Sequence, residues 1–420
     1  MNKIDNSSNI ARNMNKHKHR IGTRELRLMR ADGTIIQNQE VEVEQIKHKF
    51  LFGCSEFSSL PYKNNEFDGE EKFKVGDRLN KFVDLFNYAT LPFYWGNFEK
   101  VKGQPDTKRL RQAAEWLVSK GITLKGHPLC WHTLTAPWLM EMSNTEIMKI
   151  QLERINREVT EFKGLINIWD VINEVVIMPI FDKYDNGITR ICKDYGRLHL
   201  VREVFKAAKE SNPEATLLIN DFNTSESYDI LVEGLLEAGI PIDAIGIQSH
   251  MHQGYWGVEK TEEILERFSR FKLPIHFTEN TIVSGHIMPP EIDDLNDYQI
   301  PEWPSTPEGE ERQAREAALH YKTLFSNPNV ESITWWDFVD GLWLGAPAGF
   351  MTKDNRVKPI YNEIHNLIKN EWWSKPFTTV TNENGAVNIT GYLGDYELTY
   401  GGKKISFTID KKDDLVTLVV

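Results

Sequence analysis

Two short segments, far apart in the sequence, each place a glutamate at the end of an apolar run of the kind that forms a buried strand. The first is IWDVINE at residues 168–174, and the second is PIHFTE at residues 274–279. Retaining cleavage of a glycosidic bond uses two carboxyl groups roughly 5–5.5 Å apart, one to protonate the leaving oxygen and one to attack the anomeric carbon. We therefore predict that Glu174 is the acid/base and that Glu279 is the nucleophile of a retaining glycosidase.

Eight apolar runs, separated by segments with helical periodicity, predict the scaffold that positions these glutamates. The runs are Phe50–Cys54, Phe86–Ala89, Thr123–His127, Ile166–Ile172, Ala215–Asn220, Ala244–Gln248, Ile275–Thr278 and Ser332–Trp336. One intervening segment begins with a possible capping box at Ser143 and Glu146. Strands and helices that alternate in this way over about 300 residues are typical of a (β/α)8 TIM barrel, whose active site lies at the carboxyl ends of the strands. A doubly wound open sheet is the alternative, but no GxGxxG turn follows an early strand.

The segments that flank the predicted barrel, residues 49–372, have a different pattern. Residues 1–20 are polar, and we predict them to be disordered; residues 21–48 predict a β-hairpin around the turn Ala31–Gly33. Residues 373–420 contain strand-like runs at Val387–Ile389, Glu397–Tyr400, Ile405–Ile409 and Val416–Val420. Because an isolated hairpin is marginally stable, we expect the N- and C-terminal segments to form one small accessory β-sandwich.

Composition and charge limit the classes of partner. The chain has 420 residues and a net charge of −12, which argues against nucleic acid or an anionic membrane surface because both are bound mainly through clustered Lys and Arg. A neutral carbohydrate fits better. The three cysteines, Cys54, Cys130 and Cys192, form neither a metal-binding spacing nor an even disulfide set, which indicates a reducing compartment. No signal-like or membrane-spanning apolar run occurs, so we expect a cytoplasmic protein, or a secreted one if a leader is missing.

Several motifs, in order along the chain, resemble those of glycoside hydrolase family 10, best known for endo-β-1,4-xylanases. GHPLCWH at 126–132 resembles the family's GHxLxWH, and WDVINE at 169–174 resembles its WDVxNE, whose Glu is the acid/base. NDFN at 220–223 and GIQSH at 246–250 are similar to NDYN and GxQSH. Thr278–Glu279 matches the start of TELD, which carries the nucleophile, and residues 336–343 resemble the terminal tryptophan motif. The resemblance covers about residues 50–370 and implies retaining hydrolysis of β-1,4-xylan or xylo-oligosaccharides on a TIM barrel.

The same motifs supply the other candidate site residues. His250 could orient Glu279 and keep it ionised, and Asn173 could hydrogen-bond a sugar 2-hydroxyl, a contact that strengthens in the transition state. We expect the charge of Glu279 to raise the pKa of Glu174 by like-charge repulsion. The remaining candidates for sugar contacts are the polar residues His127 and Gln248 and the aromatic residues Tyr94, Trp95, Trp131, Trp336 and Trp343. Two carboxyl groups and a water suffice for the reaction, so no cofactor or metal is expected.

Two departures from the family pattern bear on the substrate. Typical xylanases carry a Glu-Asn-x-x-Lys-Trp run after the second strand, whereas this chain has TLPFYWGNFE at residues 90–99. Trp95 remains, but the carboxylate, amide and ammonium groups do not, so the glycone-side subsite must differ. The family's Asp two residues after the nucleophile is Thr281 here, which removes the carboxylate that would support the contact between His250 and Glu279.

Three interpretations of function stay open. The first is hydrolysis of β-1,4-xylosidic bonds, and the second is the same mechanism on a different or decorated β-linked glycan, with a glycone pocket lined by Phe93 and Tyr94. The third is a non-hydrolytic carbohydrate-binding protein on a weakened barrel. His250 and His252 could suggest a zinc site, but no third set of ligands is evident. The sequence leaves the oligomeric state open.

Overall fold

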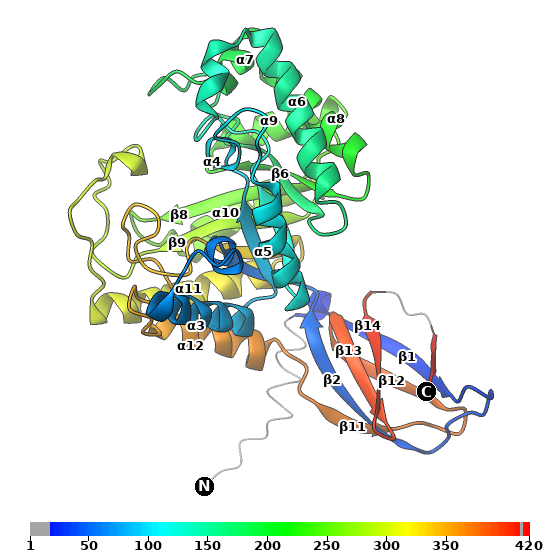
Figure 1. Ribbon diagram of the computed structural model, residues 1–420. Helices are drawn as coiled ribbons and strands as arrows, with labels where there is room; N and C mark the ends of the chain where they lie inside the picture. Colours follow the sequence, from blue (N-terminus) through cyan, green and yellow to red (C-terminus); the bar gives the residue numbers. More distant parts are fainter. Residues whose placement is uncertain (1–16, 412–414) are drawn as a thin grey trace. The chain divides into compact units, whose positions relative to one another are not determined.

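The computed structural model describes residues 17–411 and 415–420, which divide into two compact units (Figure 1). One unit is Phe52–Tyr361, and the other combines the two ends of the chain, up to Leu51 and from Asn362 onward. Residues 362–372, which we predicted to lie in the barrel, therefore group with the ends. There the Tyr392 hydroxyl donates to the carbonyl oxygen of Glu371 (3.2 Å).

Eight parallel strands close into a barrel in the order β10-β3-β4-β5-β6-β7-β8-β9. The strands are β3 (Leu51–Ser55), β4 (Tyr88–Pro92), β5 (Thr123–His127), β6 (Ile168–Asn173), β7 (Thr216–Asp221), β8 (Ala244–Met251), β9 (Ile275–Ile282) and β10 (Val330–Trp335). All eight predicted strands are confirmed, and the closure excludes the open doubly wound sheet. The differences are at strand ends. β4 begins two residues after Phe86, because the backbone N–H of Phe86 donates to the Phe82 carbonyl and ends the preceding helix, and β9 continues four residues beyond Thr278.

Helices separate the strands, as the apolar periodicity predicted. They are α2 (Ser59–Lys63), α3 (Gly69–Leu85), α4 (Trp95–Phe98), α5 (Thr107–Ser119), α6 (Asn144–Glu161), α7 (Gly187–Tyr195), α8 (Arg197–Ser211), α9 (Glu226–Glu237), α10 (Gly257–Ser269), α11 (Pro307–Ser326) and α12 (Pro359–Asn366), with short turns η2 (Pro137–Glu141), η3 (Leu295–Asp297) and η4 (Leu367–Glu371). The capping box of α6 is confirmed, since the Ser143 hydroxyl accepts from the Glu146 backbone and the Glu146 carboxylate accepts from the Ser143 backbone. No helix of the described residues is both long enough and apolar enough to cross a bilayer.

The chain ends form the expected β-sandwich. One sheet has the order β12-β1-β15 and the other has the order β11-β2-β13-β14. The strands are β1 (Ile21–Met29), β2 (Glu40–His48), β11 (Phe377–Val380), β12 (Ala386–Tyr392), β13 (Gly394–Tyr400), β14 (Lys403–Ile409) and β15 (Val416–Val419). Leu26, Val43 and Leu398 belong to one buried cluster that both sheets contribute to. Sequence analysis missed β11, whose side chains are mostly exposed and show no apolar alternation.

The predicted N-terminal hairpin is wrong, because β1 and β2 lie in different sheets. The turn itself is present: the Gly33 N–H donates to the Arg30 carbonyl, and Gly33 has a φ of +86° that favours glycine. After the turn, however, Ile36 enters the sandwich core and the chain crosses to the opposite sheet.

We predicted that residues 1–20 are disordered, and the structure tests this only for residues 17–20. Residues 1–16 lie outside the described residues. Lys18–Arg20 form the short 3-10 helix η1, and the Arg20 guanidinium lies over the Phe50 ring at 4.6 Å from its centroid. The prediction is therefore wrong for this turn, where a cation–π contact and burial of Arg20 compensate for the polar sequence.

Gly126 of β5 tests the packing inside the barrel. A Cβ atom at this position would overlap the fully buried Trp169 ring, which has no room to retreat. We expect Gly126→Ala to lower the free energy of unfolding by about 1–3 kcal/mol, as overpacking does, measured by urea denaturation. Gly234→Ala on α9 is the matched control, since a Cβ there meets open space; it should be neutral or slightly stabilising. Equal stability of the two variants would contradict this packing.

Candidate active site

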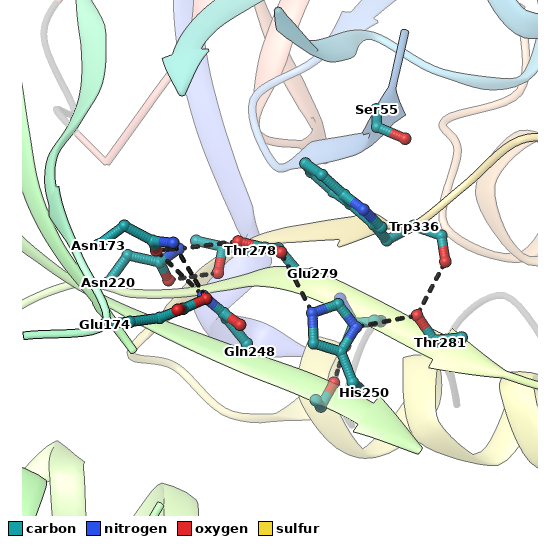
Figure 2. Close-up of polar contacts among 12 residues, drawn as sticks. Ser55, Asn173, Glu174, Asn220, Gln248, His250, Thr278, Glu279, Thr281 and Trp336 are labelled. Atoms are coloured by element: carbon teal, nitrogen blue, oxygen red, sulfur yellow. Dashed lines mark hydrogen bonds and ion pairs between the residues drawn. The ribbon is translucent and has the colours of Figure 1, made fainter. Parts of the chain in front are cut away.

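The two predicted carboxyl groups come from neighbouring regions of the carboxyl end of the barrel. Glu174 directly follows β6, and Glu279 lies in β9; β7 and β8 stand between them. Along these strands Asn173 is in register with Asn220, and Gln248 is in register with Glu279. The register therefore brings all five side chains to one level, as Figure 2 shows.

Side-chain amides connect the two glutamates. Asn220 Nδ2 donates to Asn173 Oδ1 (2.8 Å) and to Glu279 Oε1 (3.0 Å). Asn173 Nδ2 donates in turn to Glu174 Oε1 (3.2 Å), and Gln248 Nε2 donates to Asn173 Oδ1 (3.0 Å). The network fixes the position of each carboxyl group relative to the other. Sequence analysis identified Asn220 within the NDFN motif at a strand end but gave it no role in the site.

The environment of Glu174 favours a protonated acid. Burial is the main reason that its pKa is raised to about 8; the charges of Glu279 and Asp221 raise it further, and the Trp131 indole N–H lowers it by donating to Oε2 (2.8 Å). The like-charge repulsion that we predicted from the sequence is thus present but secondary to burial. The backbone of Glu174 has a φ of +57°, a left-handed conformation that is uncommon outside glycine and is often found at functional sites.

The environment of Glu279, in contrast, favours the ionised carboxylate. Burial alone would raise its pKa, but the charge of His127 and the hydrogen bond and charge of His250 outweigh it and hold the pKa below its usual value. His250 Nε2 lies 3.2 Å from Oε2 of Glu279, as the orienting role predicted from sequence requires. At neutral pH the pair therefore comprises one protonated and one ionised carboxyl group.

Thr281 stands where the family pattern has a carboxylate, and we expected this change to remove the support of the contact between His250 and Glu279. The Thr281 hydroxyl provides that support instead. Its hydroxyl donates to the carbonyl oxygen of Trp336 (2.8 Å) and lies 3.1 Å from His250 Nδ1. A hydroxyl has one proton to donate, so its oxygen is left to accept from Nδ1–H of the imidazole. This contact turns Nε2 toward Glu279 (Figure 2).

A buried chain of charged groups holds His127. Its Nδ1 lies 2.7 Å from Oδ2 of Asp170, which also forms an ion pair with Lys125 (2.7 Å). The other ring nitrogen, Nε2, lies 3.8 Å from Glu279. Asp170 therefore acts as a structural hydrogen-bond acceptor and counter-charge. Sequence analysis did not predict this role for Lys125, because the sequence alone does not show whether a lysine within a strand is buried or exposed.

The alternative of a metal site gains no support from this geometry. His250 is engaged by Glu279 and Thr281, and His252 is buried against the rings of Trp303 and Trp343. In residues 17–411 and 415–420, no group of three or more His, Cys, Asp or Glu side chains could hold a metal ion. Cys130 is fully buried.

Comparison with known proteins agrees with this arrangement. The model of a family described as "Glycosyl hydrolase family 10" matches residues 92–367. The chain belongs to glycosyl hydrolase family 10. Endo-1,4-beta-xylanase B of Thermotoga neapolitana is 26% identical over 331 residues, which cover 74% of this chain and 86% of that protein. Anti-sigma-I factor RsgI6 of Acetivibrio thermocellus is 25% identical over 390 residues, which cover 89% of this chain but only 44% of that longer protein.

Solved structures of family members share the fold. Native xylanase 10B from Thermotoga maritima aligns with a TM-score of 0.62 at 21% identity, covering 77% of this chain and 96% of that one. Xylanase 10B from Thermotoga petrophila, solved in complex with xylobiose, aligns equally well at 22% identity, covering 77% and 95%.

In this family 10 chain, most of the predicted aromatic residues gather near the carboxyl groups. The Tyr94 ring lies 5.6 Å from both His127 and Trp131, and Trp336 lies 5.4 Å from His127. Trp343 contacts His250, with the ring centroids 4.5 Å apart. Stacking of sugar rings on these faces stays a prediction.

Two aromatic residues that we placed in the site lie elsewhere. Trp95 is buried, with its indole N–H bound to Glu99 and its ring beneath the Arg154 guanidinium. Phe93, which we expected to line the glycone pocket, is fully buried against Trp169 and other rings. Phe93 and Trp95, on either side of Tyr94, are buried in the protein interior, whereas the Tyr94 ring contacts His127 and Trp131.

Asp337 adds a third carboxyl group that we did not predict for this family 10 site. It follows Trp336, accepts a hydrogen bond from the Ser55 hydroxyl (2.6 Å) and is buried. Burial raises its pKa to about 6, and the charge of Glu279 adds to the effect. A protonatable group therefore lies at the end of β10, on the side of the site where the typical polar residues after the second strand are missing.

Replacing Trp131 tests the acid. The indole N–H stabilises the charged form of Glu174, so Trp131→Phe should raise the pKa of Glu174 and move the alkaline limb of kcat/KM to higher pH. The pH profile with an aryl β-glycoside measures this. Trp138→Phe, whose indole binds the Glu99 carbonyl instead, is the control and should leave the limb in place. A shift of the alkaline limb to lower pH in Trp131→Phe would refute the assignment of Glu174 as the acid.

Replacing Thr281 tests the support of His250. Thr281→Val keeps the shape but leaves a buried imidazole N–H without its acceptor, which should lower the free energy of unfolding by about 1–3 kcal/mol and reduce kcat. Thr281→Ser keeps the hydroxyl and should retain both. The comparison requires kcat and urea denaturation of both variants, and full activity of Thr281→Val would show that the hydroxyl is not needed.

Proposed function

We propose that this chain hydrolyses β-1,4-xylosidic bonds, in xylo-oligosaccharides or xylan, by a retaining double displacement. The observation that carries the proposal is the carboxyl pair itself. Within one amide network, the pKa of Glu174 is raised to about 8 and that of Glu279 is lowered, which supports Glu174 as the acid and Glu279 as the nucleophile. Xylan as substrate is supported by the relatives, which are named as xylanases.

In the first step, Glu279 attacks the anomeric carbon as the glycosidic C–O bond breaks. Glu174 gives its proton to the leaving oxygen, so the leaving sugar departs as an alcohol and Glu279 becomes a neutral ester. Asn220 donates to Oε1 of Glu279, and Nε2 of His250 lies 3.2 Å from Oε2, so both oxygens are held in place before the attack. The positioned groups need little rearrangement, and this reduces the entropic part of the barrier.

In the second step, Glu174 works as a base. Esterification removes the charge of Glu279, which had helped to keep Glu174 protonated, so the carboxylate form left by the first step is easier to maintain. Glu174 then takes a proton from water, the water oxygen bonds to the anomeric carbon, and Glu279 leaves as a carboxylate. The sugar keeps its β configuration after two inversions.

A different or decorated β-linked glycan is the second candidate. It is favoured by one observation: the buried Asp337 and its Ser55 partner occupy the mouth near Trp336, while the stretch from Thr90 to Glu99 contributes Tyr94 but no polar equivalent of the usual glycone partners. A panel of aryl β-glycosides with different sugars would distinguish the two candidates by kcat/KM. A non-hydrolytic binding protein would turn over none of them.

Two substitutions separate the roles of the glutamates. Glu279→Gln should abolish turnover of every substrate, because no nucleophile remains. Glu174→Gln should slow the release of a sugar leaving group by about 10²–10⁴-fold, but it should slow release of a nitrophenolate far less, since that group needs no proton. Rates on xylohexaose and on 4-nitrophenyl β-xylobioside measure both effects. Proton NMR of the first sugar released should show the β-anomer, and the α-anomer would exclude retention.

A further inference from the structure

Two loops that follow different barrel strands are joined by a pair of ion pairs. Lys183, in the loop between β6 and α7, places its Nζ 2.7 Å from Asp294 Oδ2 and 2.7 Å from Asp297 Oδ1. The two aspartates belong to the long segment 283–306 between β9 and α11. We call the ion pairs of Lys183 with Asp294 and Asp297 the bridge. Glu174 follows β6 and Glu279 lies in β9, so the bridge connects the loop that follows the acid to the loop that follows the nucleophile strand.

The segment 283–306 has a small core of its own that fixes its tip. Val283, Met288 and Trp303 form a buried cluster, and Leu295 and Tyr298 pack against it. The Trp303 indole donates to the His286 carbonyl (3.0 Å), and the His286 ring contacts the Tyr298 hydroxyl (2.7 Å). Asp294 also accepts from the backbone of Asn296, which orients its carboxylate. The aspartates are therefore presented by an ordered arm.

The loop after β8 anchors the base of this arm. Gln253 Nε2 donates to the carbonyl oxygens of Pro289 (3.0 Å) and Ile292 (2.8 Å), and the Met288 N–H donates to His252 (3.0 Å). The arm thus starts at β9, touches the β8 loop and reaches the β6 loop. It passes the loop of β7, which lies between them in the barrel order.

The Lys183 end of the bridge lies near the catalytic acid. His132 Nε2 is 4.0 Å from Glu174, the His132 ring contacts Phe181, and Phe181 contacts Tyr184. The charges of Glu174 and Asp294 both contribute to the raised pKa of Tyr184, after burial, so the phenol lies within electrostatic range of the acid and of the bridge. The acid protonates the leaving group, and the residues assigned to the glycone side, Tyr94 and Trp336, follow β4 and β10, the two neighbours of β3. In the eight-stranded barrel β3 lies across from β7, and β7 and β8 stand between the two strands whose loops the bridge joins. The bridge is therefore on the leaving-group side.

We propose that Lys183, Asp294 and Asp297 are specificity-determining residues that close the leaving-group half of the cleft and restrict the protein to short leaving groups. The inference rests on the proposed function. The substrate chain then binds with its reducing end under the bridge, and cleavage releases one or two sugar units from that end. Without Lys183 the two loops would repel each other, because it is the only basic residue in segments 181–186 and 291–299, which also hold Asp182, Asp185, Glu291 and Asp293.

The three side chains are partly exposed, so the bridge is weak and sensitive to salt. Closure is thus reversible, and longer substrates are slowed and not excluded. This makes the bridge testable without unfolding the barrel, since surface ion pairs contribute little to stability.

The experiment compares wild type, Lys183→Gln and the Asp294→Asn/Asp297→Asn variant on xylohexaose labelled at its reducing end. Wild type should release labelled products of one or two units, and both variants should shift to longer labelled products with a KM for xylohexaose lower by at least about threefold. Lys193→Gln, an exposed lysine on α7, is the control and should behave as wild type. Sodium chloride at about 1 M should shift the wild-type pattern toward that of Lys183→Gln and leave the variant unchanged.

Activity on 4-nitrophenyl β-xylobioside, whose leaving group is a single ring, distinguishes a failure of this inference from a failure of the proposed function. All variants should cleave it at the wild-type rate within about twofold, since the bridge adds no interaction to so small a group. If all variants cleave this xyloside at the wild-type rate, but the labelled products of xylohexaose are the same with and without Lys183, the inference is refuted and the proposed function stands. If wild type cleaves neither this xyloside nor xylohexaose, the proposed function fails, and the leaving-group assignment fails with it.

Discussion

The relative register of β6, β7, β8 and β9 is the constraint on which the site depends. Asn173 lies opposite Asn220, and Gln248 lies opposite Glu279, so backbone hydrogen bonds of the barrel set the level of each polar side chain. Asn220 then touches both Asn173 and Glu279 and transmits that register to the carboxyl groups. A site on loops could not be held so closely, because loops lack this ladder of hydrogen bonds.

The same interior imposes opposite protonation states on two similar groups. Burial raises the pKa of both glutamates, and the difference comes from what each one contacts. Glu174 has neutral donors, from Trp131, Asn173 and Gln248, and two carboxyl neighbours. Glu279 has two imidazoles and Lys125 among the groups that lower its pKa. The acid is thus defined by its lack of cations more than by repulsion from the nucleophile. Sequence analysis expected repulsion because it identifies a second carboxylate but cannot measure burial.

Sequence reasoning succeeded where one local pattern determines the structure. The eight barrel strands were evident because strands covered on both faces are continuously apolar. It failed where the outcome depends on distant partners. β1 and β2 have the alternation of a hairpin, but the core they share with the C-terminal strands separates them into two sheets. Trp95 occupies a family position but faces Arg154, and Lys125 reaches Asp170 only because the barrel closes around both.

Thr281 shows how a change next to the nucleophile can alter its electrostatics while the geometry is kept. A hydroxyl orients the imidazole of His250 as a carboxylate would, since it accepts from Nδ1, but it has no charge to stabilise a protonated ring. Other neighbours must then contribute more to keeping Glu279 ionised. Among the groups that lower the pKa of Glu279, the charge of His127 contributes most. His127 in turn is held by Asp170, whose own charge is balanced by Lys125. The buried lysine therefore belongs to the electrostatic support of the nucleophile, and the barrel interior compensates for the carboxylate missing at its mouth.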